Sequence, residues 1–216
     1  MNRVFLFVPN IIGYFRFGFY LASFTAHAFH NWRLCFIFYI IGFVLDEFDG
    51  RAARAFNQNS NFGAALDMVA DRSATAGLCL ILAQLYPNFL LAFIIAIALD
   101  ISSHYYSIYA KGILGKSSHK DTELWANSNG LLKLYYGSKP FMDLLILGNE
   151  LLYIFLYLAY YIIGVQFSLF QWEVNIWQVA IALCLPIYLL KQLTNILQLQ
   201  SSAIQIAAID AKGGLE

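Results

Sequence analysis

Residues 46–71 read DEFDGRAARAFNQNSNFGAALDMVAD, and they join two apolar segments of the chain. Two pairs of aspartates stand in this stretch, Asp46 with Asp49 and Asp67 with Asp71. Residues three or four positions apart share one face of a helix, so each pair is expected to project on one side of its helix. If the two helices are neighbours, all of these carboxylates converge on one point. The stretch therefore predicts an acidic cluster at the end of two packed helices.

This acidic cluster has the chemistry of a divalent-cation site. An ionised carboxylate beside apolar helices is costly unless it is paired or bound to metal. Several hard oxygen ligands together suit Mg²⁺ or Mn²⁺, which also bind phosphates. Gly50 and Gly63 allow close approach of a ligand to the backbone. The small side chain of Ala53 leaves space on the same face of its helix. Arg54 offers a fixed fork of donors that fits a phosphate.

The composition outside this stretch is that of a membrane protein. The 216 residues are 60% hydrophobic and only 12% charged, whereas a soluble domain carries about 25% charged residues. The net charge of zero gives no footprint for nucleic acid. A single all-α membrane-embedded domain is expected over residues 1–216, and no strand pattern competes with the helices. The expected transmembrane segments are 4–28, 34–45, 64–86, 89–110, 140–163 and 174–199. The second of them runs on into the charged stretch that follows residue 45.

The distribution of Lys and Arg predicts the orientation of these helices. An even number of spans places both termini on one side of the membrane. The loops on the opposite side hold only Arg33, and by the positive-inside tendency the termini are therefore expected in the cytoplasm. The basic residues on the terminal side are Arg3, Arg51, Arg54, Arg72, Lys111, Lys116, Lys120, Lys133, Lys139 and Lys212.

A known family carries the same spacing. The pattern D-x2-D-G-x2-A-R-x8-G-x3-D-x3-D runs from Asp46 to Asp71 and resembles the signature of the CDP-alcohol phosphatidyltransferases at every fixed position. The resemblance implies a metal-dependent phosphotransferase with a two-metal centre of Mg²⁺ or Mn²⁺. Asp46, Asp49 and Asp67 would hold the metals over a pyrophosphate. Asp71 would act as the general base on the acceptor hydroxyl and is also a candidate metal ligand.

The resemblance also implies a site for the nucleotide and the CDP-lipid. The residues carried over to it are Asn10, Asp49, Gly50, Ala53, Arg54 and Gly63. For Asn10 a second interpretation stays open, since it could simply cap the first helix. Arg16 is expected to line the same cavity, because it is a charged residue in an otherwise apolar segment.

The rest of the chain resembles the eukaryotic branch of this family that makes phosphatidylinositol. The similar segments are 5–14, 55–58, 118–120, 135–140 and 148–151. The branch implies CDP-diacylglycerol as donor, myo-inositol as acceptor and CMP as product. It also implies a homodimer in the endoplasmic reticulum membrane, with the active site facing the cytoplasm. Lys139 departs from the arginine expected at that position.

The acceptor site is only outlined by the sequence. Asp100 and His104 lie four apart on one helix face, where they would bind ring hydroxyls or simply bond one helix to another. Lys133 and Lys139 would attract the lipid phosphate or face anionic headgroups. Together with Tyr136, these residues form the candidate inositol site.

Two other functions remain open at this stage. One is a related CDP-alcohol phosphatidyltransferase that uses serine or glycerol-3-phosphate. The other is an ion or proton transporter, in which intramembrane carboxylates form a relay. The acids here cluster at one membrane edge rather than at the midplane, which favours the transferase.

Overall fold

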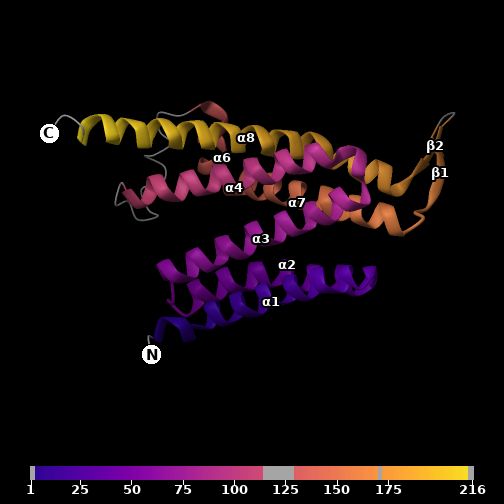
Figure 1. Cartoon of the computed structure of the whole chain (residues 1–216), viewed down its shortest axis with the longest axis horizontal. Coiled ribbons are helices and arrows are strands. Elements are labelled where there is room, and N and C mark those ends of the chain that lie inside the picture. Colours follow the sequence, from indigo (N-terminus) through magenta and orange to yellow (C-terminus); the bar gives the residue numbers. More distant parts are fainter. Residues whose placement is uncertain (1–2, 114–128, 170–171, 214–216) are drawn as a thin grey trace. The chain divides into compact units, whose positions relative to one another are not determined.

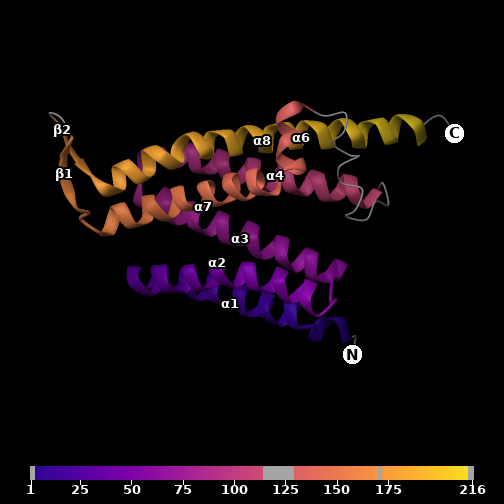
Figure 2. The ribbon, with the colours of Figure 1, turned by 180° about the vertical axis from the view of Figure 1, so that it is seen from behind.

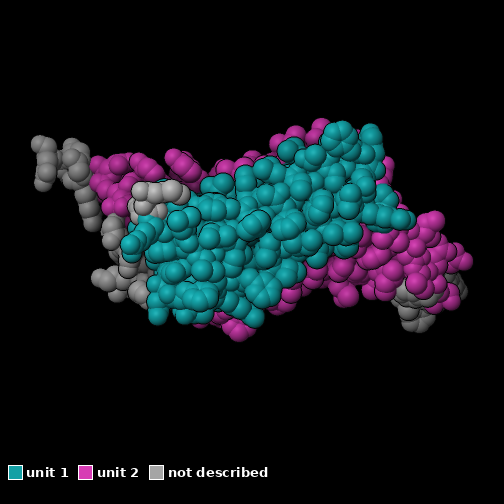
Figure 3. Space-filling model, turned by 90° about the horizontal axis from the view of Figure 1, so that it is seen from below, with its two compact units in different colours: residues 1–84 teal, residues 85–216 magenta. Residues whose placement is uncertain are grey.

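The computed structural model describes residues 3–113, 129–169 and 172–213, and nearly all of them are helical (Figure 1). The chain divides into two compact units, residues 1–84 and 85–216, which are coloured separately in Figure 3. Lys116, the segment 118–120 and the side chain of Lys212 lie outside the described residues.

The first unit holds a short 3-10 helix and three long helices. They are η1 (Arg3–Leu6), α1 (Val8–Ala28), α2 (Trp32–Ala55) and α3 (Asn61–Leu85). Helices α1 and α2 are antiparallel neighbours along most of their length (Figure 1). Small residues bring α1 close to α3, because a Cβ at Gly13 would lie 2.9 Å from Leu66. Segments predicted at 4–28, 34–45 and 64–86 are thus confirmed as helices.

The connection between α2 and α3 is shaped by its polar residues. Asn57 adopts a left-handed conformation (φ 52°) just after α2, and the Gln58 amide donates to the Ala53 carbonyl at 3.0 Å. The Ser60 hydroxyl then accepts from the Gly63 amide at 3.0 Å, which caps the start of α3. Gln58 also accepts from the Val8 amide at 2.8 Å. These bonds fix the ends of α2 and α3 that carry the motif, and they tie the turn to α1.

The second unit contains the remaining helices and one hairpin. They are η2 (Pro87–Phe89), α4 (Leu90–Ile113), α6 (Gly130–Gly137), α7 (Lys139–Tyr161), β1 (Gln166–Leu169), β2 (Trp172–Asn175) and α8 (Ile176–Gly213). Helix α8 packs along α7 and α4, and α7 and α8 lie side by side in Figures 1 and 2. The antiparallel hairpin pairs Gln166 with Asn175 and Ser168 with Glu173. The expectation that strands are absent was therefore wrong for this short connection between α7 and α8.

Several polar side chains are buried in the described part of the chain, and many apolar side chains are exposed. Arg16, Asn10, Thr194, Asn195 and Ser202 are buried almost completely. Many large hydrophobic side chains are instead exposed, among them Leu80, Leu91, Ile95, Tyr105 and Leu183. A lipid environment accounts for this inversion, since polar groups in a membrane protein turn towards the bundle interior.

Three helical stretches are long and apolar enough to cross a membrane, by length and composition. They are Pro87–Ile113, Lys139–Tyr161 and Ile176–Ala211, all of them in the second unit. Within the described residues, α1, α2 and α3 carry Arg16 and the motif aspartates, which lower their mean hydropathy. The structure thus supports an integral membrane protein with three candidate spans, and the expectation of six stays a prediction.

Candidate active site

The motif aspartates meet at one end of the first unit. Asp46 and Asp49 stand one turn apart on α2, and Asp67 and Asp71 stand one turn apart on α3. One carboxylate oxygen from each of Asp46, Asp49 and Asp67 lies within 4.8 Å of the others, a spacing that could hold a metal ion. The convergence expected from the spacing is therefore present in the structure.

Arg16 of α1 pairs with every motif aspartate. Its Nη1 donates to Asp49 Oδ2 at 3.1 Å and to Asp67 Oδ1 at 2.6 Å. Its Nη2 lies 2.7 Å from Asp46 Oδ1 and also donates to Asp71 Oδ1. The sequence predicted only that Arg16 lines a cavity. The only feature of the sequence that indicated its pairing with the aspartates was a lone charge within an apolar helix. That feature does not identify the partners of the arginine.

Burial falls steadily from the arginine towards the carboxylates. The Arg16 side chain is 1% exposed and that of Asp49 is 12% exposed. The side chains of Asp71, Asp46 and Asp67 are 33%, 45% and 48% exposed, respectively. The guanidinium therefore lies on the buried side of the cluster, and the carboxylates lie on its open side.

Burial raises the pKa of the two aspartates that follow the apolar segment 34–45, and neighbouring carboxylates add to the shift. The pKa of Asp46 is raised to about 7, mainly by burial and then by the Asp71 carboxylate, while Arg16 opposes the shift. The pKa of Asp49 is raised to about 6, again chiefly by burial and against the effect of Arg16. Bound cations would favour the ionised forms of both groups.

The donor set fits the divalent cations that the sequence implies. Carboxylate oxygens from α2 and α3 face one another, and no soft ligand is among them. Mg²⁺ and Mn²⁺ prefer such oxygen ligands and leave positions for the oxygens of a phosphate. Arg72 extends the positive charge around the cluster, with its Nη2 3.6 Å from Asp71 Oδ2.

The residues carried over to the nucleotide site occupy neighbouring positions on the same helices. Asn10 is buried on α1 and donates from Nδ2 to the Val4 carbonyl at 2.6 Å. A Cβ at Gly63 would lie 2.7 Å from Asn10 Oδ1, so only glycine leaves room for this side chain. Arg54 is exposed at the end of α2, and its Nη1 reaches back to within 3.5 Å of a Cβ built on Gly50. Ala53 lies one residue before it.

The candidate acceptor residues all belong to the second unit. On α4, His104 Nδ1 is 2.8 Å from the Asp100 carbonyl oxygen and 3.6 Å from Asp100 Oδ1. This local pairing is compatible with both interpretations of these two residues. Lys133 is exposed and Tyr136 half-buried on α6, and Lys139 is exposed at the start of α7.

A buried polar cluster on α8 was not predicted. Lys191 Nζ lies 5.5 Å from the centre of the Tyr135 ring and donates to Asn195 Oδ1. Further along α8, Gln198 Nε2 donates to the Ser103 carbonyl of α4 at 3.2 Å. Their spacing along an apolar helix was visible in the sequence, but it gave no pattern known for a particular chemistry.

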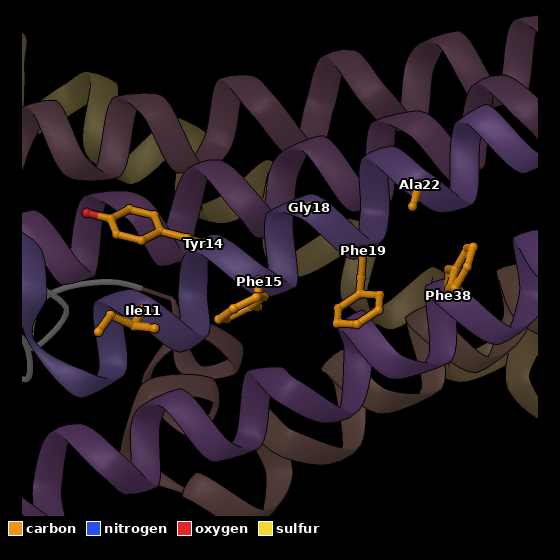
Figure 4. A pocket seen from close by; sticks show the side chains of 7 residues that line it. All are labelled: Ile11, Tyr14, Phe15, Gly18, Phe19, Ala22 and Phe38. Atoms are coloured by element: carbon orange, nitrogen blue, oxygen red, sulfur yellow. The ribbon is translucent and has the colours of Figure 1, made fainter.

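A separate hollow of about 470 Å³ opens on the outer face of α1 and α2 (Figure 4). The hollow is bordered by Phe15 and Phe19 of α1 and by Phe38 of α2. Gly18 also lines it and has no side chain to fill the space. None of its lining residues is charged. The aromatic stripe was interpreted as lipid contact, and the lining gives no reason to assign catalysis to this hollow.

The helices of the first unit and their aspartate cluster define a class of protein. The model of the CDP-alcohol phosphatidyltransferase family matches residues 6–123, and the chain belongs to this family. No solved structure matches the chain.

Similar proteins in several eukaryotes share one name. A Candida albicans protein called CDP-diacylglycerol–inositol 3-phosphatidyltransferase is 41% identical over 211 residues, which cover 98% of this chain and 86% of that protein. The Homo sapiens protein of the same name is 39% identical over 218 residues, covering 97% of this chain and 95% of its own length. The Drosophila melanogaster protein so named is 34% identical, with 98% and 89% covered.

Proposed function

We propose that this chain is a phosphatidylinositol synthase. It transfers the phosphatidyl group of CDP-diacylglycerol to a hydroxyl of myo-inositol and releases CMP. The observation that carries the proposal is the convergence of the motif aspartates around one buried arginine. The relatives that match along nearly the whole chain support inositol as the acceptor.

In this proposal the carboxylates of Asp46, Asp49 and Asp67 would hold two Mg²⁺ or Mn²⁺ ions. A bound divalent cation would supply positive charge against the pyrophosphate and the CMP leaving group. Arg54, exposed beside Gly50, binds a phosphate of the nucleotide. Asn10 and Gly63 shape the adjoining surface, where their close approach leaves no room for a larger residue.

Asp71 is the proposed base. Arg16 engages its Oδ1, and its Oδ2 lies 3.6 Å from Arg72, beyond ordinary hydrogen-bond length. That second oxygen is the one we assign to the acceptor hydroxyl. The hydroxyl oxygen bonds to the phosphorus of the phosphatidyl group, and its proton passes to Asp71. The bond from that phosphorus to the oxygen shared with the CMP phosphate breaks, and CMP leaves with the electron pair.

The acceptor is the part of the proposal that needs a direct test. Purified protein in lipid nanodiscs is supplied with CDP-diacylglycerol, Mn²⁺ and, separately, inositol, serine, glycerol-3-phosphate or choline. CMP release and the lipid product are measured for each. Inositol is expected to give the highest kcat/KM. A better rate with serine or glycerol-3-phosphate would reassign the acceptor within the family, and absence of CMP release with every alcohol would favour the transporter.

The proposal extends to the arrangement of the chain in the membrane. It includes one domain with six spans, both termini and the active site in the cytoplasm, residence in the endoplasmic reticulum, and a homodimer. Cysteine labelling tests the orientation in sealed microsomes, after Cys35, Cys79 and Cys184 are replaced. An impermeant thiol reagent added outside should label Asn59→Cys and spare Val165→Cys. The opposite result would invert the topology.

A further inference from the structure

Arg16 joins three helices through one side chain. Its Nη1 links Asp49 of α2 to Asp67 of α3, and its Nη2 links Asp46 of α2 to Asp71 of α3. Each terminal nitrogen therefore bridges one carboxylate from each helix. Lysine has a single nitrogen on a flexible stem and cannot reproduce this planar fork.

The position of the guanidinium is set by the carboxylates. Within the described part of the chain, the Arg16 Nε is buried and has no hydrogen-bond partner. Leaving a buried donor unpaired is costly, so the contacts of the two Nη atoms must outweigh it. This balance indicates that the side chain is held where it is by the aspartates rather than by its neighbours on α1.

The arrangement leaves the carboxylates able to bind something else. Arg16 engages one oxygen of each aspartate: Oδ1 of Asp46, Asp67 and Asp71, and Oδ2 of Asp49. The second oxygen of each is not used by Arg16, and the side chains of Asp46 and Asp67 are 45% and 48% exposed above an arginine that is 1% exposed. One guanidinium charge also leaves the cluster negative when its aspartates are ionised, so further cations are still attracted.

We propose that Arg16 is a positioning residue of the metal centre. From the buried side it holds all the motif carboxylates in the arrangement that receives divalent cations on the open side, and it keeps its own bonds when the cations bind. This role rests on the proposed function, because the cations are those that the transfer uses. It differs from the alternative in which the guanidinium occupies the place of a cation and must leave before the ion can enter.

Metal binding measured without turnover separates these possibilities. Protein stripped of metal is placed in nanodiscs without CDP-lipid, and Mn²⁺ is titrated with detection of the free ion by electron paramagnetic resonance. The variants are Arg16→Lys, which keeps the charge, and Arg16→Gln, which removes it. The matched control is Arg51→Lys on α2, where the arginine Nε pairs with Glu47 at 2.7 Å and both side chains are well exposed.

We expect Arg16→Lys to bind Mn²⁺ about 10- to 100-fold more weakly, the usual effect of losing a group that orients metal ligands. Arg16→Gln should lose at least as much, and Arg51→Lys should bind like the wild type. If Arg16→Gln does not fold, Arg16→Lys alone decides. Unchanged affinity in Arg16→Lys would overturn the positioning role, and tighter binding in either variant would identify Arg16 as a competitor of the cation.

The wild-type titration keeps this inference distinct from the proposed function. If the wild-type protein binds no Mn²⁺, the metal centre itself fails, and the role of Arg16 fails with it. If the wild type binds Mn²⁺ and Arg16→Lys binds it equally well, only the role of Arg16 fails. A thermal-shift series supports the proposal when saturating Mn²⁺ stabilises the wild type more than Arg16→Lys at the same concentration.

Discussion

The two compact units bury polar groups in different ways. The first unit gathers the motif aspartates around Arg16, so its buried charge is balanced by opposite charge. The second unit buries mainly uncharged groups along α4 and α8, such as Ser103, Thr194 and Gln198, and these bond to backbone carbonyls. Charge that must meet a substrate needs a counter-ion, whereas neutral polar groups can serve helix packing alone.

The family model and the similar proteins cover different parts of the chain. The family model ends at residue 123, so it covers the first unit and α4 but not α6, α7 or α8. The relatives from fungi and animals match nearly the whole chain. We therefore expect the reaction type to depend on the first unit and the preference for inositol to depend on residues of the second.

Removal of divalent metal should have the largest effect. Carboxylates crowded beside a pyrophosphate need cations to neutralise them, so a chelator should abolish CMP release. Mg²⁺ or Mn²⁺ added back in excess should restore it, while Ca²⁺ with its longer bonds serves as a control for non-specific charge. Full turnover in protein verified as metal-free by elemental analysis would remove the metal centre from the first unit.

Asp71→Asn should come next in magnitude. Loss of the base is expected to lower kcat by roughly 10²- to 10⁴-fold while CDP-diacylglycerol still binds. Asp46→Asn should lose binding of the CDP-lipid as well, as measured by a nucleotide-displacement assay. Glu47→Gln is the control, because this acid lies beside Asp46 but faces outward towards Arg51. Equal loss of binding in both aspartate variants would make Asp71 another metal ligand.

Substitution of Asp100 and His104 tests the second unit. Asp100→Ala and His104→Ala should each raise the KM for inositol by roughly 3- to 10-fold, the scale of one lost hydrogen bond. The KM for CDP-diacylglycerol should stay nearly constant. Tyr109→Phe, on an exposed position of the same helix, controls for general effects on α4. If neither KM changes, the pair is structural and the inositol site is to be sought around Lys133, Tyr136 and Lys139.

The smallest expected effect concerns packing alone. Gln198→Met removes the bond to the Ser103 carbonyl and should lower the free energy of unfolding by about 0.6 kcal/mol, a typical value between membrane helices. Unfolding in mixed detergent micelles measures this change. Gln200→Met, at an exposed position nearby, should leave stability unchanged. A loss of activity much larger than the loss of stability would mean that Gln198 contributes to a binding site.

The sequence predicted the first unit better than the second for a physical reason. The spacing of the aspartates follows helix geometry, so their convergence required only that α2 and α3 pack together. The partners of Arg16 lie 30 to 55 residues away, and no local pattern marks them. The aspartates do meet as the spacing predicted, and the roles assigned to them stay predictions.

In the second unit, the hairpin and the full length of α8 were not predicted, because the sequence patterns that mark them are short or only partly apolar. Residues 166–175 alternate in polarity over too few positions to compete with the long apolar segments around them. The last apolar segment was expected over about 174–199, and α8 contains most of it. The helix continues to Gly213, since residues such as Ala207, Ala208 and Ala211 favour helix even where the segment is no longer apolar.

The length of α8 has a consequence for the thickness of the bilayer around it. Its 38 residues extend over roughly 57 Å at about 1.5 Å per residue, nearly twice the hydrocarbon depth of about 30 Å. Transmembrane helices tilt by at most about 40°, which shortens this projection only to roughly 44 Å. If α8 spans the membrane, between about 14 and 27 Å of it must therefore stand outside the hydrocarbon. A fluorophore fused after α8 would show how much of this length extends on the C-terminal side, since it escapes quenchers among the acyl chains only if the helix end lies beyond them.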